Sequence, residues 1–131
     1  MKKENKEMKK QSNNELQISL SKKQVDSVLD LYSSGKINEA IEAIKALNKD
    51  YPNVPLLFNL LGACYNTLDQ LDAAAQMFKN AFSIKPDYAE AYFNHGIVMR
   101  DLGQLDNAVE SYKSAIDLIP NYPEAHNKLG I

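Results

Sequence analysis

Apolar residues recur along this chain at the spacing of amphipathic helices. Phe58, Leu61 and Tyr65 are spaced to share one helix face, and Ala74 and Phe78 continue the pattern after a short polar segment. No comparable stretch alternates strictly between apolar and polar residues, as a half-buried strand would. Helices are therefore expected over residues 21–34, 38–49, 55–68, 72–84, 89–102 and 106–118, with a further short helix from about residue 122.

The expected helices repeat with a period of 34 residues. Pro52, Pro86 and Pro120 follow one another at that interval, and five further columns of similar residues align with them. These columns are Phe58, Tyr92 and His126; Gly62, Gly96 and Gly130; Ala40, Ala74 and Ala108; Ile44, Phe78 and Tyr112; and Leu47, Ala81 and Ala115. The period predicts a series of helical hairpins, each closed by a proline, because proline lacks an amide donor and restricts the residue before it.

Two local signals support these boundaries. Ser21 followed by Gln24 fits a capping box at the start of a helix, and Asp87 followed by Glu90 resembles a second one.

Small residues recur where two helices of a hairpin would cross. Gly62 pairs with Ala74 in one unit, and Gly96 pairs with Ala108 in the next. We expect a closely packed core at these crossings, with Leu61, Ala74, Phe78 and Tyr112 among its members.

One unit resembles the tetratricopeptide repeat family, whose pattern runs aromatic, Leu-Gly, Tyr, Ala, Phe, Ala, Pro. The matching residues are Phe58, Leu61, Gly62, Tyr65, Ala74, Phe78, Ala81 and Pro86. The next unit departs from the pattern at His95 and Met99, and the first unit has Gln24 and Val28 where the aromatic residue and glycine would stand.

The resemblance covers residues 21–131 and implies an all-α fold. It implies a right-handed superhelix, or α-solenoid, of three stacked helical hairpins with a truncated fourth repeat helix. The implied domain is 15–131, with repeats at 21–54, 55–88 and 89–122 and a partial repeat at 123–131.

The fourth unit stops within its first helix. A repeat buries its faces against its neighbours, so an incomplete one leaves apolar surface open. We expect the chain either to be a piece of a longer protein or to make the missing contact with another molecule, most simply as a homodimer through the truncated repeat.

Composition excludes several classes of partner. The chain has 131 residues, 44% of them hydrophobic, and a net charge of −2, so it lacks the basic excess of a nucleic-acid-binding domain. No apolar run approaches the roughly 20 residues that span a bilayer. The single Cys64 excludes an intramolecular disulfide, and the cytoplasm is the expected location.

Residues 1–14 form a charged leader with almost no apolar side chains. Such a segment cannot offset its ordering entropy by burial, so we expect it to be disordered. The alternative is an arm that contacts nucleic acid or a membrane, but acidic residues are interspersed among its lysines and no aromatic residues interleave.

In the family that this chain resembles, the first helix of each repeat lines a concave groove. The corresponding positions include Val25, Asp26, Leu29 and Ala63. The candidate peptide-binding residues among them are Tyr32, Asn59, Leu60, Asn66, Phe93, Asn94, Ile97 and Arg100. The alternative is that some of these side chains only pack between helices.

Two binding modes of the family can be compared with these positions. The clamp that holds the C-terminal carboxylate of chaperone tails is absent, because Leu60 and Glu90 stand where it needs Asn and Lys. Val25 and Leu29 replace two further clamp residues. Asn94 instead resembles the groove asparagine with which O-linked N-acetylglucosamine transferases hold a peptide backbone, since an amide offers both a donor and an acceptor.

No catalytic or metal constellation is apparent. His95 is expected to be a core histidine that needs a hydrogen-bond partner, and Cys64 a small buried hydrophobe. With His126 they lie in three different units, without the spacing of a zinc site, and no cofactor motif occurs. The acids in residues 67–72 and 101–106 do not fall at EF-hand positions, so these segments are expected to be turns.

These observations favour a non-catalytic interaction module that binds a peptide or a partner helix. The alternative is the N-terminal substrate-recruiting arm of a larger transferase, because the repeats also resemble those that precede glycosyltransferase and sulfotransferase domains in bacteria.

Overall fold

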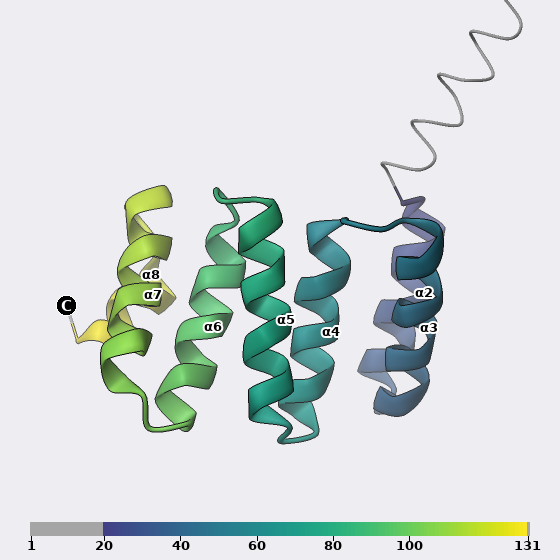
Figure 1. The fold of residues 1–131 in the computed structure, drawn as a ribbon, viewed down its shortest axis with the longest axis horizontal. Coiled ribbons are helices and arrows are strands. Elements are labelled where there is room, and N and C mark those ends of the chain that lie inside the picture. The colour runs from purple at the N-terminus through teal and green to yellow at the C-terminus, as the bar shows by residue number, and fades with distance from the viewer. Residues whose placement is uncertain (1–19, 131) are drawn as a thin grey trace, which may run out of the picture. The chain divides into compact units, whose positions relative to one another are not determined.

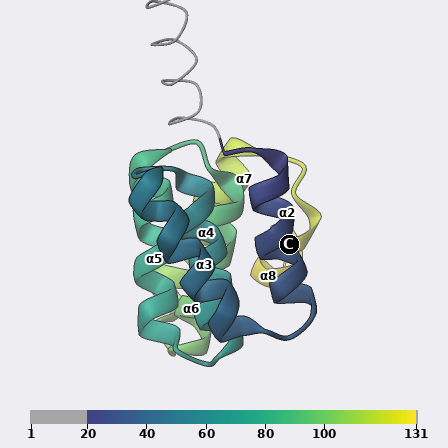
Figure 2. The same cartoon turned by 90° about the vertical axis from the view of Figure 1, so that its right-hand side faces the viewer.

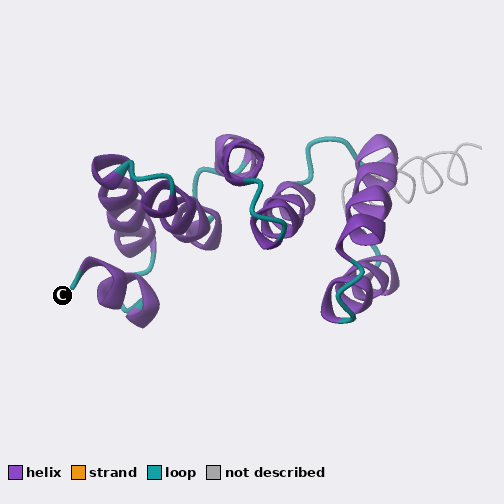
Figure 3. Ribbon diagram, turned by 90° about the horizontal axis from the view of Figure 1, so that it is seen from below, coloured by secondary structure: helices purple, strands orange, loops and turns teal. Residues whose placement is uncertain are grey.

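The structure is a computed structural model that describes residues 20–130. The chain divides into two compact units, Met1–Val54 and Pro55–Ile131, which are described separately below. Every regular element among the described residues is a helix, and Figure 3 shows helices and loops without a strand there. The all-α class predicted from the sequence is therefore confirmed. The leader expected to be disordered, residues 1–14, lies outside the described residues.

Unit 1 contributes one described hairpin, formed by α2 (Lys22–Ser33) and α3 (Ile37–Asp50). The predicted capping box opens α2. The Ser21 hydroxyl oxygen accepts from the backbone N–H of Gln24 at 3.2 Å, and Gln24 Oε1 accepts from the backbone N–H of Ser21 at 3.1 Å. The two helices contact each other, and both Val28 and Ile44 are buried.

Unit 2 consists of five helices that follow one another in space as they do in sequence (Figure 1). They are α4 (Pro55–Thr67), α5 (Leu71–Ile84), α6 (Ala89–Asp101), α7 (Leu105–Leu118) and α8 (Pro123–Leu129). The hairpin α4–α5 stacks on the hairpin α6–α7 through contacts between α5 and α6, and α8 packs on α7. Helices α4 and α6 also contact each other directly, and they lie next to each other in Figure 2. The predicted helix boundaries agree with the observed ones to within about one residue.

The second helix of each hairpin ends just before a proline. Helices α3, α5 and α7 end at Asp50, Ile84 and Leu118, in each case two residues before the proline of the repeat. The intervening residue adopts an extended backbone, as the residue before a proline must. The prediction that the prolines set the ends of these helices is confirmed.

The second predicted capping box, at Asp87 and Glu90, is wrong. Helix α6 begins at Ala89, so the residue at its N-cap is Tyr88, and no side chain caps the helix there. The carboxylate of Glu90 turns instead toward α4, where it accepts a hydrogen bond from Asn59 Nδ2 at 3.5 Å. A tertiary contact has therefore taken the side chain that the local pattern assigned to the cap.

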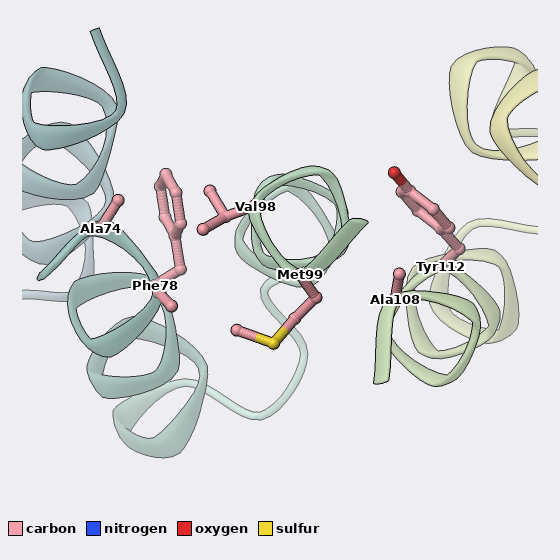
Figure 4. Packing of buried hydrophobic residues seen from close by; sticks show 7 residues of the cluster. Ala74, Phe78, Val98, Met99, Ala108 and Tyr112 are labelled. Carbon is pink, nitrogen blue, oxygen red and sulfur yellow. The ribbon is translucent and has the colours of Figure 1, made fainter. Parts of the chain in front are cut away.

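The core of unit 2 lies between α5, α6 and α7. Its labelled members in Figure 4 are Ala74 and Phe78 on α5, Val98 and Met99 on α6, and Ala108 and Tyr112 on α7. The ring of Phe78 lies beside Val98 (Figure 4). The four residues predicted to lie in the core are all buried, and Phe78 and Tyr112 are only 1% and 2% exposed.

Two glycines allow the aromatic rings of the core to approach a helix backbone. A Cβ atom on Gly62 would lie 2.5 Å from the Phe78 ring, and one on Gly96 would lie 2.6 Å from the Tyr112 ring. Real Cβ atoms do not come so close, so any larger residue would have to displace the ring. The predicted close crossing of the two helices is present in both hairpins.

The turn inside each hairpin uses the left-handed backbone region at the same place of the repeat. Gly35, Asp69 and Gly103 have φ values of 78°, 59° and 80°. Glycine adopts this conformation without steric cost, and aspartate is one of the few other residues that tolerate it. The acidic segments 67–72 and 101–106 are thus helix-to-helix turns, as predicted.

Candidate functional site

The predicted peptide-binding residues fall in both units. Tyr32 belongs to α2 of unit 1 and is exposed. The other seven belong to unit 2, where they are distributed between α4 and α6: Asn59, Leu60, Asn66, Phe93, Asn94, Ile97 and Arg100. We call the side chains of unit 2 on and immediately before its first helices α4, α6 and α8 the first-helix face, and the candidate site is built from them.

A chain of three polar side chains joins α4 to α6 on this face. Asn59 Nδ2 donates to Glu90 Oε1 at 3.5 Å, and Asn94 Nδ2 donates to Asn59 Oδ1 at 3.1 Å. Asn59 is 4% exposed and lies between the two helices. It therefore acts as a link behind the surface, and the open part of this chain is at Asn94, which is half-buried.

The carboxylate sets the direction of both amides. Ionised Glu90 can only accept hydrogen bonds, so the NH2 group of Asn59 must face it and the carbonyl oxygen of Asn59 must face Asn94. Asn94 then turns its own NH2 group inward. Its Oδ1 has no hydrogen-bond partner among residues 20–130, which leaves an acceptor and the second N–H of the amide for a ligand.

Aromatic side chains stand next to this amide. The ring of Phe93 lies 5.2 Å from that of Tyr122, just before α8, and 5.8 Å from that of Tyr112, between centroids. Phe93 and Ile97 are half-buried and pack against the core, so only part of each is open at the surface. Arg100 is exposed and pairs with its neighbour Asp101 at 3.4 Å.

The phenols on this face have raised pKa values. Burial, with the Glu90 carboxylate as a smaller cause, raises the pKa of Tyr88 to about 12, while a hydrogen bond to Asn59 acts in the opposite direction. Burial also raises the pKa of Tyr122, and the carboxylates of Glu90 and Glu124 add to that effect. Both tyrosines therefore keep their protons at neutral pH and remain uncharged aromatic surfaces.

Sequence reasoning did not select Tyr88, Tyr122 or Glu124 as site residues. A signal for them exists, because Tyr88 and Glu90 recur 34 residues later as Tyr122 and Glu124. The repeated Tyr-x-Glu pattern places a tyrosine at the N-cap and a glutamate in the first turn of both α6 and α8.

His95 lies away from this amide chain, on the other side of α6. Its Nδ1 is 2.7 Å from Ser111 Oγ, and its ring meets that of Phe82 edge-on, with 5.3 Å between centroids. Burial, followed by the Lys79 ammonium, lowers the pKa of His95, so the imidazole is neutral at pH 7. The expectation of a core histidine with a hydrogen-bond partner is confirmed.

Two cavities of about 310 and 170 Å³ adjoin His95. Both are lined by Phe82 and Asn107, and the larger one reaches Lys79. Their walls come from α5, α6 and α7. Among residues 20–130, no carboxylate orients the imidazole, as an activated His–Ser pair would need.

The remaining candidates for chemistry are accounted for by packing. Cys64 is buried, and burial raises the pKa of its thiol, so it stays in the neutral, unreactive form. His126 Nε2 lies 2.8 Å from the carbonyl oxygen of Pro120. Within the described part of the chain, no group of His, Cys, Asp and Glu side chains is arranged to hold a metal, and no helix could cross a membrane.

Comparison with solved structures shows the same fold in other proteins. The crystal structure of MamA is 25% identical and has a TM-score of 0.77, with 82% of this chain and 63% of that chain covered. The first TPR of Spaghetti (RPAP3), bound to the HSP90 peptide SRMEEVD, is 26% identical over 79% of this chain and 82% of its own, with a TM-score of 0.77. A mutant Thermobaculum terrenum O-GlcNAc transferase, at 24% identity, shares only the fold, with a TM-score of 0.77 and coverage of 82% of this chain and 21% of that one. The chain thus spans a little less than two thirds of the length of MamA.

Comparison by sequence identifies the family. A search of curated proteins returns no match. A model of the tetratricopeptide repeat matches residues 25–82, and a second TPR repeat model matches residues 98–131, so that the two together account for more than half of the chain. The 34-residue period, the glycine beneath each core ring and the proline after each second helix are the features that these models describe, and the chain belongs to the tetratricopeptide repeat family.

Proposed function

We propose that this chain is a non-catalytic interaction module that binds an extended peptide, or a helix of a partner protein, on the first-helix face of unit 2. The observation that carries the proposal is the orientation of Asn94, whose amide is held from behind by Asn59 and presents a free carbonyl oxygen.

An amide held in this way suits a peptide backbone. Its oxygen accepts from a main-chain N–H, and its remaining N–H donates to a main-chain carbonyl, so it can hold a chain whatever its side chains are. Because Asn59 and Glu90 fix the amide before binding, the ligand does not have to order it, which lowers the entropic cost of association. Half-buried Phe93 and Ile97 beside it offer apolar surface for the ligand's side chains.

Peptide-bound structures of the same fold support this class of function, but the ligand must differ. The HSP90 peptide in the Spaghetti (RPAP3) structure ends in Glu-Glu-Val-Asp. Here Leu60 and Glu90 occupy two positions of the carboxylate clamp, and Glu90 would repel an acidic tail. The similarity to an O-GlcNAc transferase is one of fold alone, so it adds nothing to the alternative of a transferase arm.

The experiment is a selection of peptides from a random library on the full chain, followed by affinity measurement with variants. Asn94→Ala should weaken binding of the selected peptides about 5- to 30-fold, because the backbone contacts of the amide are lost. Asn107→Ala is the matched control, since this amide is exposed on α7 and bonds only to Gln104. Helix content by circular dichroism should not change in either variant.

Selected peptides that bind the Asn94→Ala variant and the parent equally would move the site off the first-helix face. The same result is expected if Tyr32 of unit 1, and not Asn94, is the main contact. Tyr32→Ala therefore belongs in the same series.

The homodimer expected from the sequence stays a prediction. Leu105 and Val109 on α7 are 61% and 39% exposed, whereas Ala75, which stands 34 residues before Val109, is only 8% exposed. Sedimentation equilibrium at about 100 μM checks it, because association depends on protein concentration. A dimer that dissociates in the Leu105→Gln, Val109→Gln variant would place the contact on α7, and a monomer mass for the parent would contradict it.

A further inference from the structure

The repeated Tyr-x-Glu pattern has a different environment at its two occurrences. At the first, Lys85 of the same chain places its ammonium 5.0 Å from the centroid of the Tyr88 ring. Cations are attracted to the face of an aromatic ring by its quadrupole. The chain therefore already binds one cation on the first tyrosine of the pair.

The second tyrosine lacks that cation. The residue 34 positions after Lys85 is Ile119, which is exposed and carries no charge. Tyr122 is half-buried, and its packing partner on the inner side is Phe93, 5.2 Å away between ring centroids. The ring thus keeps an open part, and no ammonium or guanidinium lies over it among the described residues.

Negative charge surrounds this open ring. Glu90 and Glu124 are both close enough to Tyr122 to raise its pKa, beyond the larger effect of burial. Neither carboxylate forms an ion pair within residues 20–130, where Arg100 and Asp101 make the only one. Lys128 lies one turn after Glu124 on α8 but does not pair with it. Glu90 uses only one of its oxygens, toward Asn59.

This place is continuous with the proposed peptide site. Phe93, which packs on Tyr122, is the neighbour of Asn94 in α6, and Glu90 orients Asn94 through Asn59. A peptide whose backbone is held at Asn94 would therefore bring a side chain to Tyr122 with little additional ordering.

We propose that Tyr122, Glu90 and Glu124 form a binding site for a positively charged side chain, so that the partner of this module is a peptide segment containing arginine or lysine. The inference rests on the proposed function and adds the chemistry of the partner. The aromatic ring receives the cation from one side, as the Tyr88 ring receives Lys85, and the two carboxylates compensate its charge. An acidic segment, such as the chaperone tail bound by the Spaghetti (RPAP3) repeats, would be repelled here.

The test uses three synthetic peptides with blocked ends and the same Gly-Ser sequence, which differ only in a central pair of Arg, Gln or Glu residues. Each is titrated into the isotope-labelled full chain, and binding is followed through the backbone amide signals of α6 and α8. We expect the Arg peptide to bind about tenfold more tightly than the Gln peptide at low salt, with the Glu peptide weakest. Added salt should reduce the preference, because the carboxylates are partly exposed.

Variants locate the preference. Tyr122→Leu and Glu124→Gln should each reduce the advantage of the Arg peptide to about threefold or less, since one removes the ring and the other a charge. Tyr122→Phe keeps a ring and should keep the preference, which makes it the control for folding. Glu110→Gln, on the exposed side of α7, is the control for net charge.

The outcomes separate this inference from the proposed function. Equal binding of the Arg and Gln peptides, both sensitive to Asn94→Ala, would overturn the cation site and leave the peptide site standing. A preference for Arg that depends on Tyr122 and Glu124 but not on Asn94 would do the reverse. Failure of all three peptides to shift any signal would overturn both.

Discussion

The hairpins α4–α5 and α6–α7 are two copies of one repeat, and they are alike inside and different outside. In both, a glycine on the first helix lies beneath an aromatic ring of the second, Gly62 with Phe78 and Gly96 with Tyr112. The outward residues of the two first helices have little in common, since α4 has no charged residue and α6 carries Glu90, Arg100 and Asp101. The packing rules of the repeat are therefore independent of the chemistry that the repeat presents.

The largest effects are expected where the hairpins are most alike. Phe78→Ala and Tyr112→Ala should each lower the free energy of unfolding by about 3–5 kcal/mol, because both remove a fully buried ring. Urea unfolding monitored by circular dichroism measures the change. A loss below about 1 kcal/mol in one of the two would show that the hairpins do not share a packing rule.

The glycines beneath the rings should come next. Gly62→Ala and Gly96→Ala should each cost about 1–3 kcal/mol, because the new methyl group overlaps the ring above it. In a double-mutant cycle, Phe78→Leu should remove most of the cost of Gly62→Ala, since the atoms that clash are those of the ring. Strictly additive costs would contradict this explanation.

The two rings differ by one hydroxyl group. The Tyr112 hydroxyl is buried without a hydrogen-bond partner, whereas Phe78 has no such group. Tyr112→Phe should therefore stabilise the chain by about 1 kcal/mol, and Phe78→Tyr should destabilise it by about 1–3 kcal/mol. Opposite shifts of the thermal midpoint are the expected result, and shifts of the same sign would contradict it.

The turns of the two hairpins differ at one position. Asp69 and Gly103 occupy the same place with φ values of 59° and 80°. Asp69→Gly should stabilise the first hairpin by about 0.5–1 kcal/mol by relieving the strain of a side chain in the left-handed region, and Gly103→Asp should cost a similar amount in the second. Chemical denaturation of the two variants side by side checks both signs.

The smallest effect concerns pH. His95 stands where the first hairpin has Leu61, and its pKa is lowered mainly by burial and further by Lys79. A histidine with a lowered folded-state pKa stabilises the fold above its unfolded pKa of about 6.5, and this contribution is lost as pH falls through the folded value. His95→Leu should reduce the loss of stability below about pH 6.5, and an unchanged pH profile would mean that the imidazole is protonated equally in both states.

Much of the fold was predictable because the repeat is a local pattern written several times. The proline after each second helix acts on the backbone of its own neighbours, and the Ser21–Gln24 capping box forms within one turn. The failed prediction at Asp87 and Glu90 shows the limit of such arguments. The side chain of Glu90 had a partner 31 residues away, Asn59, which no local pattern can rank against a cap.

The sequence by itself determined the helices, their boundaries, the rings of the core and the family, because these depend on spacing along the chain and recur at each period. Only the tertiary structure decided which of the predicted site residues are open to a ligand. Asn59 and Asn94 look equivalent as amides on first helices, yet packing of α4 against α6 buries Asn59 and leaves Asn94 half-exposed. The pairing of Phe93 with Tyr122, and the approach of Glu90 to both Asn59 and Tyr122, likewise join residues of different repeats. A repeat sequence specifies how each unit packs, but the contacts between unlike residues of neighbouring units depend on distances that exist only once the units have stacked.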